Sequence, residues 1–257
     1  MVRRIMTGIF AAMLAVSLIW LGAIGRQEKA ARMDYKEAAH IAQELPVSDF
    51  QQGADEPMPA DAEIIRLQNM DIQALREINR DVLGWICIGG TGVDYPLLRG
   101  ADNEHYLKYD WKNKQNVSGS IFMERENAAD FSDFNTIIYG HNMRSGAMFG
   151  GLKEYGNQAY WEAHPYIYII NDSGVFRYDI FAAHKVDTDS IVYAMEINNT
   201  DRREEFIRFA LDNSMVNTGI EPKAEDRIIT LSTCTGETDT RWVVQGVLNE
   251  EYYKRSR

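Results

Sequence analysis

Short β-type runs separated by turn residues fill the chain from residue 82 onward, and no other feature limits the fold as strongly. The runs are rich in β-branched and aromatic side chains, which fit a pleated, half-buried surface. They cover residues 82–88, 93–98, 119–123, 136–139, 166–170, 175–183, 227–234 and 241–248. Eight short strands are typical of a barrel or a sandwich, so we expect a mainly β fold.

Two helical patterns flank these strands. Residues 62–81 carry apolar side chains at roughly helical spacing, which predicts one or two short helices that cover the sheet. Residues 201–214 place Phe206, Phe209 and Ala210 on one side and charged side chains mostly on the other. This pattern predicts a long surface helix before the last hairpin. The fold class that follows is mainly β with flanking helices.

An uncharged run over residues 5–25 follows Arg3 and Arg4. As a helix it rises about 1.5 Å per residue, which is enough to cross a hydrocarbon core about 30 Å thick. The run predicts a single-pass anchor in the cell membrane, with the N-terminus cytoplasmic because two arginines precede it; a cleaved signal peptide is the alternative. We expect a transmembrane anchor over 1–25, an exposed helical stalk and linker over 26–61, and an extracellular folded domain over 62–257.

Charge and cysteine content exclude several classes of protein. The net charge of −11 repels phosphates, so nucleic acid is not an expected partner. The two cysteines, Cys87 and Cys234, lie far apart, and no Cys or His spacing resembles a zinc ligand set. We therefore expect no metal, no cofactor and no disulfide-stapled fold. A free thiol outside the cytoplasm is open to oxidation, so a cysteine kept there invites a chemical role.

Cys234 and Arg241 border the last predicted hairpin. Cys234 ends the strand 227–234, and Arg241 opens the next strand after a polar, turn-like segment. The hairpin would bring the two side chains together. An unperturbed thiol has a pKa of about 8.5, and a neighbouring guanidinium favours the reactive thiolate. Arg241 can also hydrogen-bond the oxyanion that forms when the sulfur attacks a carbonyl.

His141 is the expected proton donor for a leaving amine. It follows strand 136–139 directly after Gly140, and histidine is the side chain best suited to exchange protons near neutral pH. The other histidines are less well placed, and His184 ends a predicted strand in polar surroundings. Each residue also has an ordinary interpretation, as a turn histidine, a solvated arginine or a buried apolar cysteine. The last interpretation is the one we prefer for Cys87.

Together, the three residues resemble the signature of the sortase family. Residues 230–234, Thr-Leu-Ser-Thr-Cys, followed by Arg241, resemble the family's cysteine motif, and residues 139–142, Tyr-Gly-His-Asn, resemble its histidine motif. Shorter stretches are similar to class B sortases: Gly84-Trp-Ile, Asp94-Tyr-Pro96, Asp102-Asn103 with Tyr106-Leu107, and Gly119-Ser-Ile-Phe-Met123. The resemblance covers residues 64–248, nearly the whole predicted domain.

The resemblance implies an eight-stranded sortase-type β-barrel over the catalytic domain, and a cysteine transpeptidase that cleaves a C-terminal sorting signal after threonine. Cys234 would form a thioacyl intermediate, His141 would protonate the leaving amine and Arg241 would steady the oxyanion. The partners would be surface proteins that carry the signal, and an amine acceptor on a peptidoglycan precursor or on a pilin. The peptide groove would fall on the following positions: Asn103, Leu107, Ser232, Thr188 and Tyr193.

Two other classes of protein fit parts of this pattern. A hydrolytic, membrane-anchored cysteine peptidase also uses Cys and His, but its papain-like form places Cys before His in the chain, the reverse of the order here. A non-enzymatic β-module that binds a wall polymer would keep Cys234 as a buried structural residue. The product formed in the presence of an amine distinguishes the first alternative, and thiol reactivity distinguishes the second.

Overall fold

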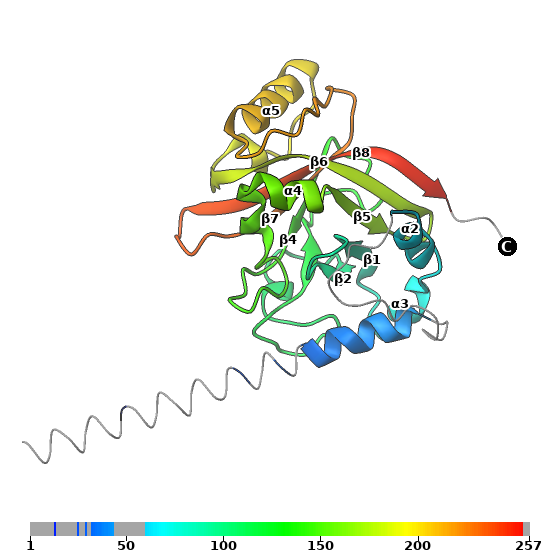
Figure 1. Ribbon diagram of the computed structural model, residues 1–257. Coiled ribbons are helices and arrows are strands. Elements are labelled where there is room, and N and C mark those ends of the chain that lie inside the picture. Colours follow the sequence, from blue (N-terminus) through cyan, green and yellow to red (C-terminus); the bar gives the residue numbers. More distant parts are fainter. Residues whose placement is uncertain (1–12, 14–24, 26–28, 30–31, 44–59, 254–257) are drawn as a thin grey trace, which may run out of the picture.

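The computed structural model describes Met13, Gly25, Lys29, residues 32–43 and residues 60–253 (Figure 1). Within these residues, eight strands close a barrel in the order β1-β2-β3-β4-β7-β8-β6-β5. The strands are Val82–Cys87 (β1), Asp94–Leu98 (β2), Ile121–Met123 (β3), Asn135–Tyr139 (β4), Tyr166–Ile170 (β5), Gly174–Asp187 (β6), Ile228–Cys234 (β7) and Thr240–Tyr253 (β8). The predicted fold class, an eight-stranded β-barrel with flanking helices, is confirmed.

The pairing of β4 with β7 determines where the chain leaves the barrel. These two strands are parallel, with a register that runs from Asn135↔Ile228 to Tyr139↔Ser232. Because parallel strands end at the same edge of a sheet, the segment after β4 and the end of β7 emerge side by side. β7 then pairs with β8 in antiparallel fashion, and Cys234 lies opposite Arg241 in that register.

The strands at this edge are buried on both faces. Ile229 and Leu231 of β7 belong to the main core cluster, whereas Ile228 belongs to a second cluster that includes Phe206 of the long helix. Three hydroxyl residues of β7 are buried as well, and each has a hydrogen-bond partner: Thr230 bonds Asn135, Ser232 bonds Tyr193 and Thr233 bonds the Gly140 carbonyl. Only its last residue, Cys234, is exposed.

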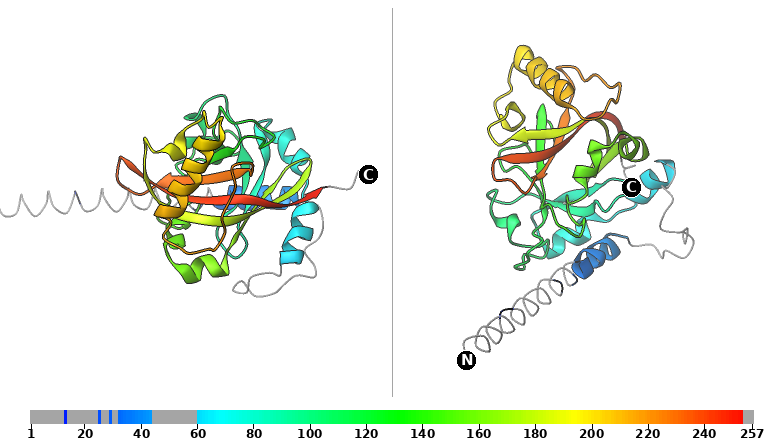
Figure 2. Two further views of the ribbon diagram at one scale, coloured as in Figure 1. Left: turned by 90° about the horizontal axis from the view of Figure 1, so that it is seen from above. Right: turned by 60° about the vertical axis from the view of Figure 1, so that its left-hand side comes forward.

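Besides a helix over residues 32–42, four helices and three short 3-10 turns flank the barrel in the described part of the chain. They are α2 (Ala60–Gln68), α3 (Ile72–Ile78), α4 (Gln158–Ala163), α5 (Thr200–Asn213), η1 (His105–Leu107), η2 (Leu152–Gly156) and η3 (Ile191–Tyr193). α5 begins at a cap in which the Asn199 side chain accepts a hydrogen bond from the Arg202 backbone N–H. It packs on the β6 side of the barrel, opposite the helix over residues 32–42 (Figure 2).

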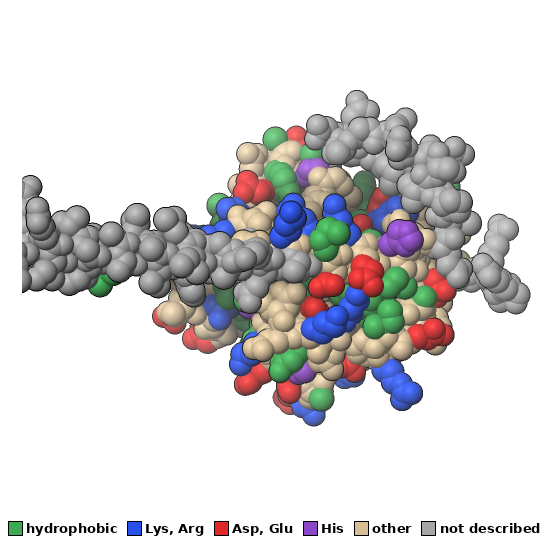
Figure 3. All heavy atoms as spheres, turned by 90° about the horizontal axis from the view of Figure 1, so that it is seen from below, with side chains coloured by type: hydrophobic (Ala, Val, Ile, Leu, Met, Phe, Trp, Pro, Cys, Tyr) green, Lys and Arg blue, Asp and Glu red, His purple; other side chains and the backbone are tan. Residues whose placement is uncertain are grey.

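The helix over residues 32–42 is docked rather than exposed, contrary to the predicted stalk. Tyr35 is buried, its ring meets that of Tyr95 edge to face, and its hydroxyl donates to the Gly119 carbonyl at 2.5 Å. Lys112 forms an ion pair with Glu37 at 2.5 Å. On the face shown in Figure 3, Lys and Arg side chains lie among Asp and Glu side chains. The predicted domain boundary at residue 62 stays a prediction.

The predicted membrane location requires correction. No helix within the described ranges is both long enough and apolar enough to cross a bilayer. The helix over residues 32–42 is short and carries charged side chains, among them Asp34 and Lys36. The predicted anchor, residues 1–25, lies outside the described residues apart from Met13 and Gly25. The prediction of a single-pass protein with a cytoplasmic N-terminus and an extracellular domain is contradicted by this finding.

His184 also differs from its predicted setting. The sequence placed it at the end of a strand in polar surroundings, but β6 extends to Asp187 and His184 is 1% exposed. Its Nε2 hydrogen-bonds the Gln245 side chain at 2.9 Å. Burial lowers the pKa of His184, so the imidazole is neutral in the folded chain near neutral pH. Polar residues follow His184 in the sequence, so the predicted strand ended before the observed end of β6 at Asp187.

Candidate active site

The segments that carry the predicted catalytic residues meet at one edge of the barrel. Asn142, next to His141, donates from its side-chain amide to the Cys234 backbone carbonyl at 2.7 Å. Thr233 donates from its hydroxyl to the Gly140 carbonyl at 2.7 Å. These two bonds fasten the chain around the histidine to the end of β7. The structure thus brings the histidine and cysteine segments together as the sequence predicted.

Gly140 lies directly before the histidine and packs closely against two core side chains. A Cβ at this position would lie 2.4 Å from Cδ1 of Ile121 and 2.8 Å from Cδ2 of Phe149. Such distances are far inside ordinary van der Waals contact, so only glycine fits between these two core side chains. The glycine break seen in the sequence therefore has a packing cause, and it places His141 at the mouth of β4.

The His141 ring is held by a backbone carbonyl. Its Nε2 lies 2.7 Å from the Leu107 carbonyl oxygen. Because a carbonyl can only accept, Nε2 carries the hydrogen, and Nδ1 is the nitrogen left for proton exchange. The Cδ2 atom of the ring lies 3.1 Å from the position that a Cβ of Gly119 would occupy. Gly119 thus gives the ring room, and Leu107 contributes to the site through its backbone.

Cys234 and Arg241 face each other across the β7–β8 hairpin. Cys234 is a free, exposed thiol. Arg241 donates from Nη1 to the carbonyls of Thr238 at 3.0 Å and Thr240 at 2.8 Å. No hydrogen-bond partner among the described residues is found for its Nε and Nη2, so these N–H groups are available to an incoming oxyanion.

Two tyrosines lie within electrostatic reach of this pair. The pKa of Tyr193 is raised, chiefly by burial; the Arg241 charge acts to lower it and Cys234 acts to raise it. The pKa of Tyr139 is likewise raised by burial and by Glu124, and is lowered by Arg241. Both phenols therefore stay protonated.

The predicted groove residues lie around the same edge, with Thr188 at its margin. Ser232 and Tyr193 share a hydrogen bond of 2.8 Å between their hydroxyls. Asn103 donates to the Glu124 carboxylate, which accepts a second bond from the Tyr139 hydroxyl at 3.0 Å. Thr188 is exposed, and its N–H donates to the carbonyl of Asp239 in the β7–β8 turn.

The sequence did not identify Glu124 as a site residue. It stands directly after β3 as an ordinary acidic residue, and no motif marks it. Tyr139 and Asn142 were quoted only as neighbours of His141 in a motif. Their side chains nevertheless contact Glu124 and the Cys234 carbonyl, respectively. Both belong to the segment that leaves β4, which the sequence did mark.

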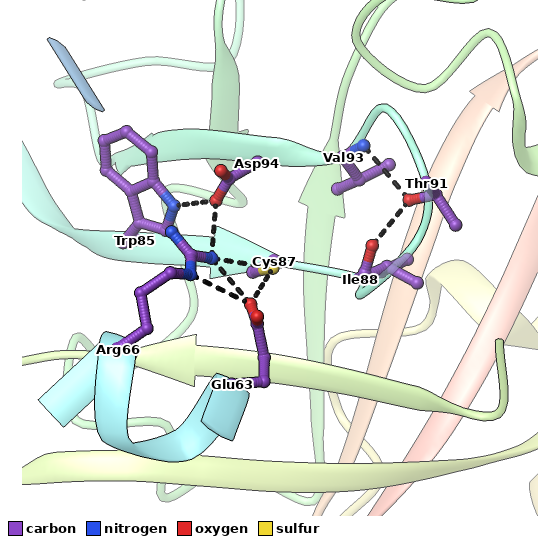
Figure 4. Close-up of polar contacts among 8 residues, drawn as sticks. All are labelled: Glu63, Arg66, Trp85, Cys87, Ile88, Thr91, Val93 and Asp94. Atoms are coloured by element: carbon purple, nitrogen blue, oxygen red, sulfur yellow. Dashed lines mark hydrogen bonds and ion pairs between the residues drawn. The ribbon is translucent and has the colours of Figure 1, made fainter. Parts of the chain in front are cut away.

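The second cysteine lies in a buried polar cluster rather than a purely apolar site. The Cys87 thiol donates to Glu63 at 3.0 Å, and Arg66 binds both Glu63 and Asp94 (Figure 4). Burial raises the pKa of Cys87 well above its usual range, and the nearby carboxylates add to this shift. Cys87 is therefore a neutral thiol that helps to hold α2 against β1. Among residues 32–43 and 60–253, no group of three or more His, Cys, Asp or Glu side chains is arranged to hold a metal ion.

The comparison with known proteins assigns the chain to a family. The sortase domain model matches residues 86–249. The Sortase B of Listeria monocytogenes is 38% identical over 183 residues, which cover 69% of this chain and 74% of that protein. The chain belongs to the sortase family.

Solved structures narrow this assignment. A Staphylococcus aureus sortase B-substrate complex matches with a TM-score of 0.74 at 29% identity, over 88% of this chain and 99% of that one. A Sortase B complexed with triglycine matches with a TM-score of 0.73 at 30% identity, over 87% and 99% of the two chains. Within the family, the chain is a class B sortase and hence a cysteine transpeptidase. The predicted family, class and type of enzyme are confirmed.

Proposed function

We propose that this chain cleaves a C-terminal sorting signal after threonine and joins the protein to an amine, with Cys234 as the nucleophile. One observation carries the proposal. An exposed free thiol lies in register with Arg241 at the edge where Asn142 ties the histidine segment to β7. A nucleophile, a proton-exchanging group and a fixed cation at one edge are what acyl transfer requires.

In the first half of the reaction, the Cys234 thiolate attacks the carbonyl carbon of the signal's threonine. The free N–H groups of Arg241 stabilise the oxyanion, because a guanidinium keeps its charge throughout. The C–N bond then breaks, and His141 gives its Nδ1 proton to the departing amine. The product is a thioester between the threonine carbonyl and the Cys234 sulfur.

In the second half, an acceptor amine attacks the thioester. His141 takes a proton from the amine, the new amide bond forms, and Cys234 leaves as thiolate. The proposed acceptor is an amine on a peptidoglycan precursor or on a pilin. The substrate and the triglycine held by the two similar structures support a peptide donor and an amine acceptor.

Full-length protein incubated with a library of threonine-containing signal peptides and an amine tests the reaction. Wild type should yield the peptide joined to the amine, and Cys234→Ala should yield none, because the thioester cannot form. Cys87→Ala is the matched control and should retain the product, since Cys87 is buried with α2. Mass spectrometry of the products separates joined peptide from free acid.

The products also separate the proposal from hydrolysis. A cysteine peptidase would release mainly free acid even with the amine in excess. A transpeptidase would instead form the joined peptide faster than the free acid. Product that persists in Cys234→Ala would refute the assignment of the nucleophile. His141→Ala and Arg241→Ala should each reduce the rate of joining by about 100-fold or more.

A further inference from the structure

Glu124 is a buried carboxylate without a cation. It follows β3, and the residue is 7% exposed. None of the ion pairs in the described part of the chain includes it. Removing a carboxylate from water is unfavourable unless hydrogen bonds replace the lost hydration. Hydrogen bonds from neutral groups must therefore hold this carboxylate.

Neutral donors from two distant parts of the chain satisfy this carboxylate. Oε1 accepts from the side-chain amide of Asn103 and from the backbone N–H of Glu126 at 3.3 Å. Oε2 accepts from the Tyr139 hydroxyl at 3.0 Å. Asn103 belongs to the predicted peptide groove, and Tyr139 lies opposite Ser232 in the β4–β7 register. Glu124 therefore links a predicted groove residue to the end of β4, which lies beside Ser232.

These bonds fix the orientation of the Asn103 amide. Its Nδ2 faces Glu124, which as a carboxylate can only accept, while its Oδ1 accepts the Arg125 backbone N–H at 2.8 Å. A rotated amide would place its oxygen against the carboxylate and its NH2 against a backbone donor. The amide is left with one free hydrogen and one free lone pair. That pair of groups matches the C=O and N–H of an extended peptide backbone.

The Tyr139 hydroxyl is oriented in the same way. Because its hydrogen points to Glu124, the oxygen has only lone pairs left for another partner. Burial raises the pKa of Tyr139 and the Glu124 charge raises it further, so the hydroxyl remains a donor to the carboxylate. Tyr139 also lies within electrostatic reach of Tyr193 and Arg241. The orientation of the Asn103 amide and of the Tyr139 hydroxyl thus depends on one carboxylate.

We propose that Glu124 is a positioning residue: it sets the direction of the Asn103 amide and the Tyr139 hydroxyl, and through them it controls binding of the sorting peptide. It does not take part in the attack by Cys234. The proposal rests on the proposed function, because it assumes that a peptide lies over Asn103.

Glu124→Gln tests the proposal with little change in shape. The amide turns one acceptor position into a donor, so the Asn103 amide or the Tyr139 hydroxyl must reorient. A hydrogen bond to a charged group contributes about 1.5–3 kcal/mol, so the KM of the sorting peptide should rise about 10- to 100-fold. The kcat and the alkylation rate of Cys234 should stay within about twofold, because the nucleophile is untouched. Glu124→Asp, which keeps the charge, should recover part of the loss.

Glu63→Gln is the matched control. Glu63 is also a buried glutamate, but it lies on α2, across the barrel from the β7–β8 hairpin (Figure 1). This variant should keep the wild-type KM even where it lowers thermal stability.

A double-mutant cycle identifies the route by which Glu124 acts. If Glu124 acts through Asn103, then Glu124→Gln added to Asn103→Ala should raise KM by less than about threefold. Tyr139→Phe removes the hydrogen bond between Tyr139 and Glu124. It is the test variant if Glu124→Gln does not fold.

Three results would overturn the proposal. They are an unchanged KM in Glu124→Gln, a fall in kcat alone, or full additivity with both Asn103→Ala and Tyr139→Phe. Failure of the proposed function would give a different result. In that case the wild-type protein itself would form no joined peptide, or would form it equally well without Cys234.

Discussion

Gly119→Ala should disable the enzyme by displacing the histidine. Gly119 has a φ of 53°, and a Cβ there would lie 2.5 Å from the Tyr106 carbonyl oxygen and 3.0 Å from that of Leu107. The first distance is about 0.9 Å short of the 3.4 Å at which ordinary contact begins. Both neighbours are backbone atoms and cannot rotate away. The Leu107 carbonyl, which holds His141 at 2.7 Å, must therefore move.

The size of this effect follows from the displacement. A catalytic group misplaced by about 1 Å reduces the rate by about 100-fold, so kcat/KM for the joined peptide should fall by that order. The left-handed backbone adds a loss of stability of about 1–2 kcal/mol. Initial rates of Cys234-dependent joining and thermal unfolding, measured on the same preparation, report the two effects separately.

Gly219→Ala is the control for backbone strain. Gly219 has a φ of 68°, lies between α5 and β7, and has no atom within 4 Å of its Cβ position. It should lose a similar amount of stability, about 1–2 kcal/mol, while kcat/KM stays within about twofold. If Gly119→Ala lost stability like Gly219→Ala but kept wild-type kcat/KM, the role assigned to the Leu107–His141 contact would be refuted.

The two cysteines should differ in their rate of alkylation. Burial raises the pKa of the Cys87 thiol, so Cys87 should resist alkylation between about pH 7 and pH 9. Cys234 is exposed and should react over the same range. Equal labelling in peptide mapping would contradict this. Arg66→Met leaves its buried carboxylate partner without a cation and should lower the free energy of unfolding by about 3 kcal/mol in denaturant titration. Arg202→Met, which breaks an exposed ion pair, should lower it by less than about 1 kcal/mol. Because burial lowers the pKa of His184, the unfolded chain binds a proton that the folded chain does not, and stability should fall as pH drops below about 6.5. His184→Gln should flatten this slope.

The sequence predicted the elements well because their signals are local. Each of the eight β-type runs overlaps one strand, and the helix predicted over residues 201–214 is α5, Thr200–Asn213. The predicted ends of the strands were less accurate. β8 continues to Tyr253 and β6 to Asp187, and in both extensions charged residues interrupt the apolar pattern. These extensions are held by pairing between β6 and β8, which composition does not encode.

The candidate site was predictable only where motifs mark it. Cys234, Arg241 and His141 were named from motifs, and the structure places their segments at one edge, while their individual roles stay predictions. Glu124 was missed because its contacts, to Asn103 and Tyr139, are long-range and leave no periodic trace. The docked helix over residues 32–42 was misread for the same reason, since its apolar face meets the barrel through a few small or aromatic side chains.

The parallel pairing of β4 with β7 has a consequence for the newly made chain. β7 is among the last segments to be synthesised, yet it must pair with β4, which lies far upstream in the chain. Non-local pairings of this kind form slowly. The long intervening segment must lose conformational entropy as it closes, before any contact between the strands can stabilise the pair. The end of β7, which carries Cys234, therefore reaches the segment around His141 only after β4 and β7 have paired. If Cys234 is the nucleophile, as proposed, the onset of acyl transfer should report that β7 has joined the barrel.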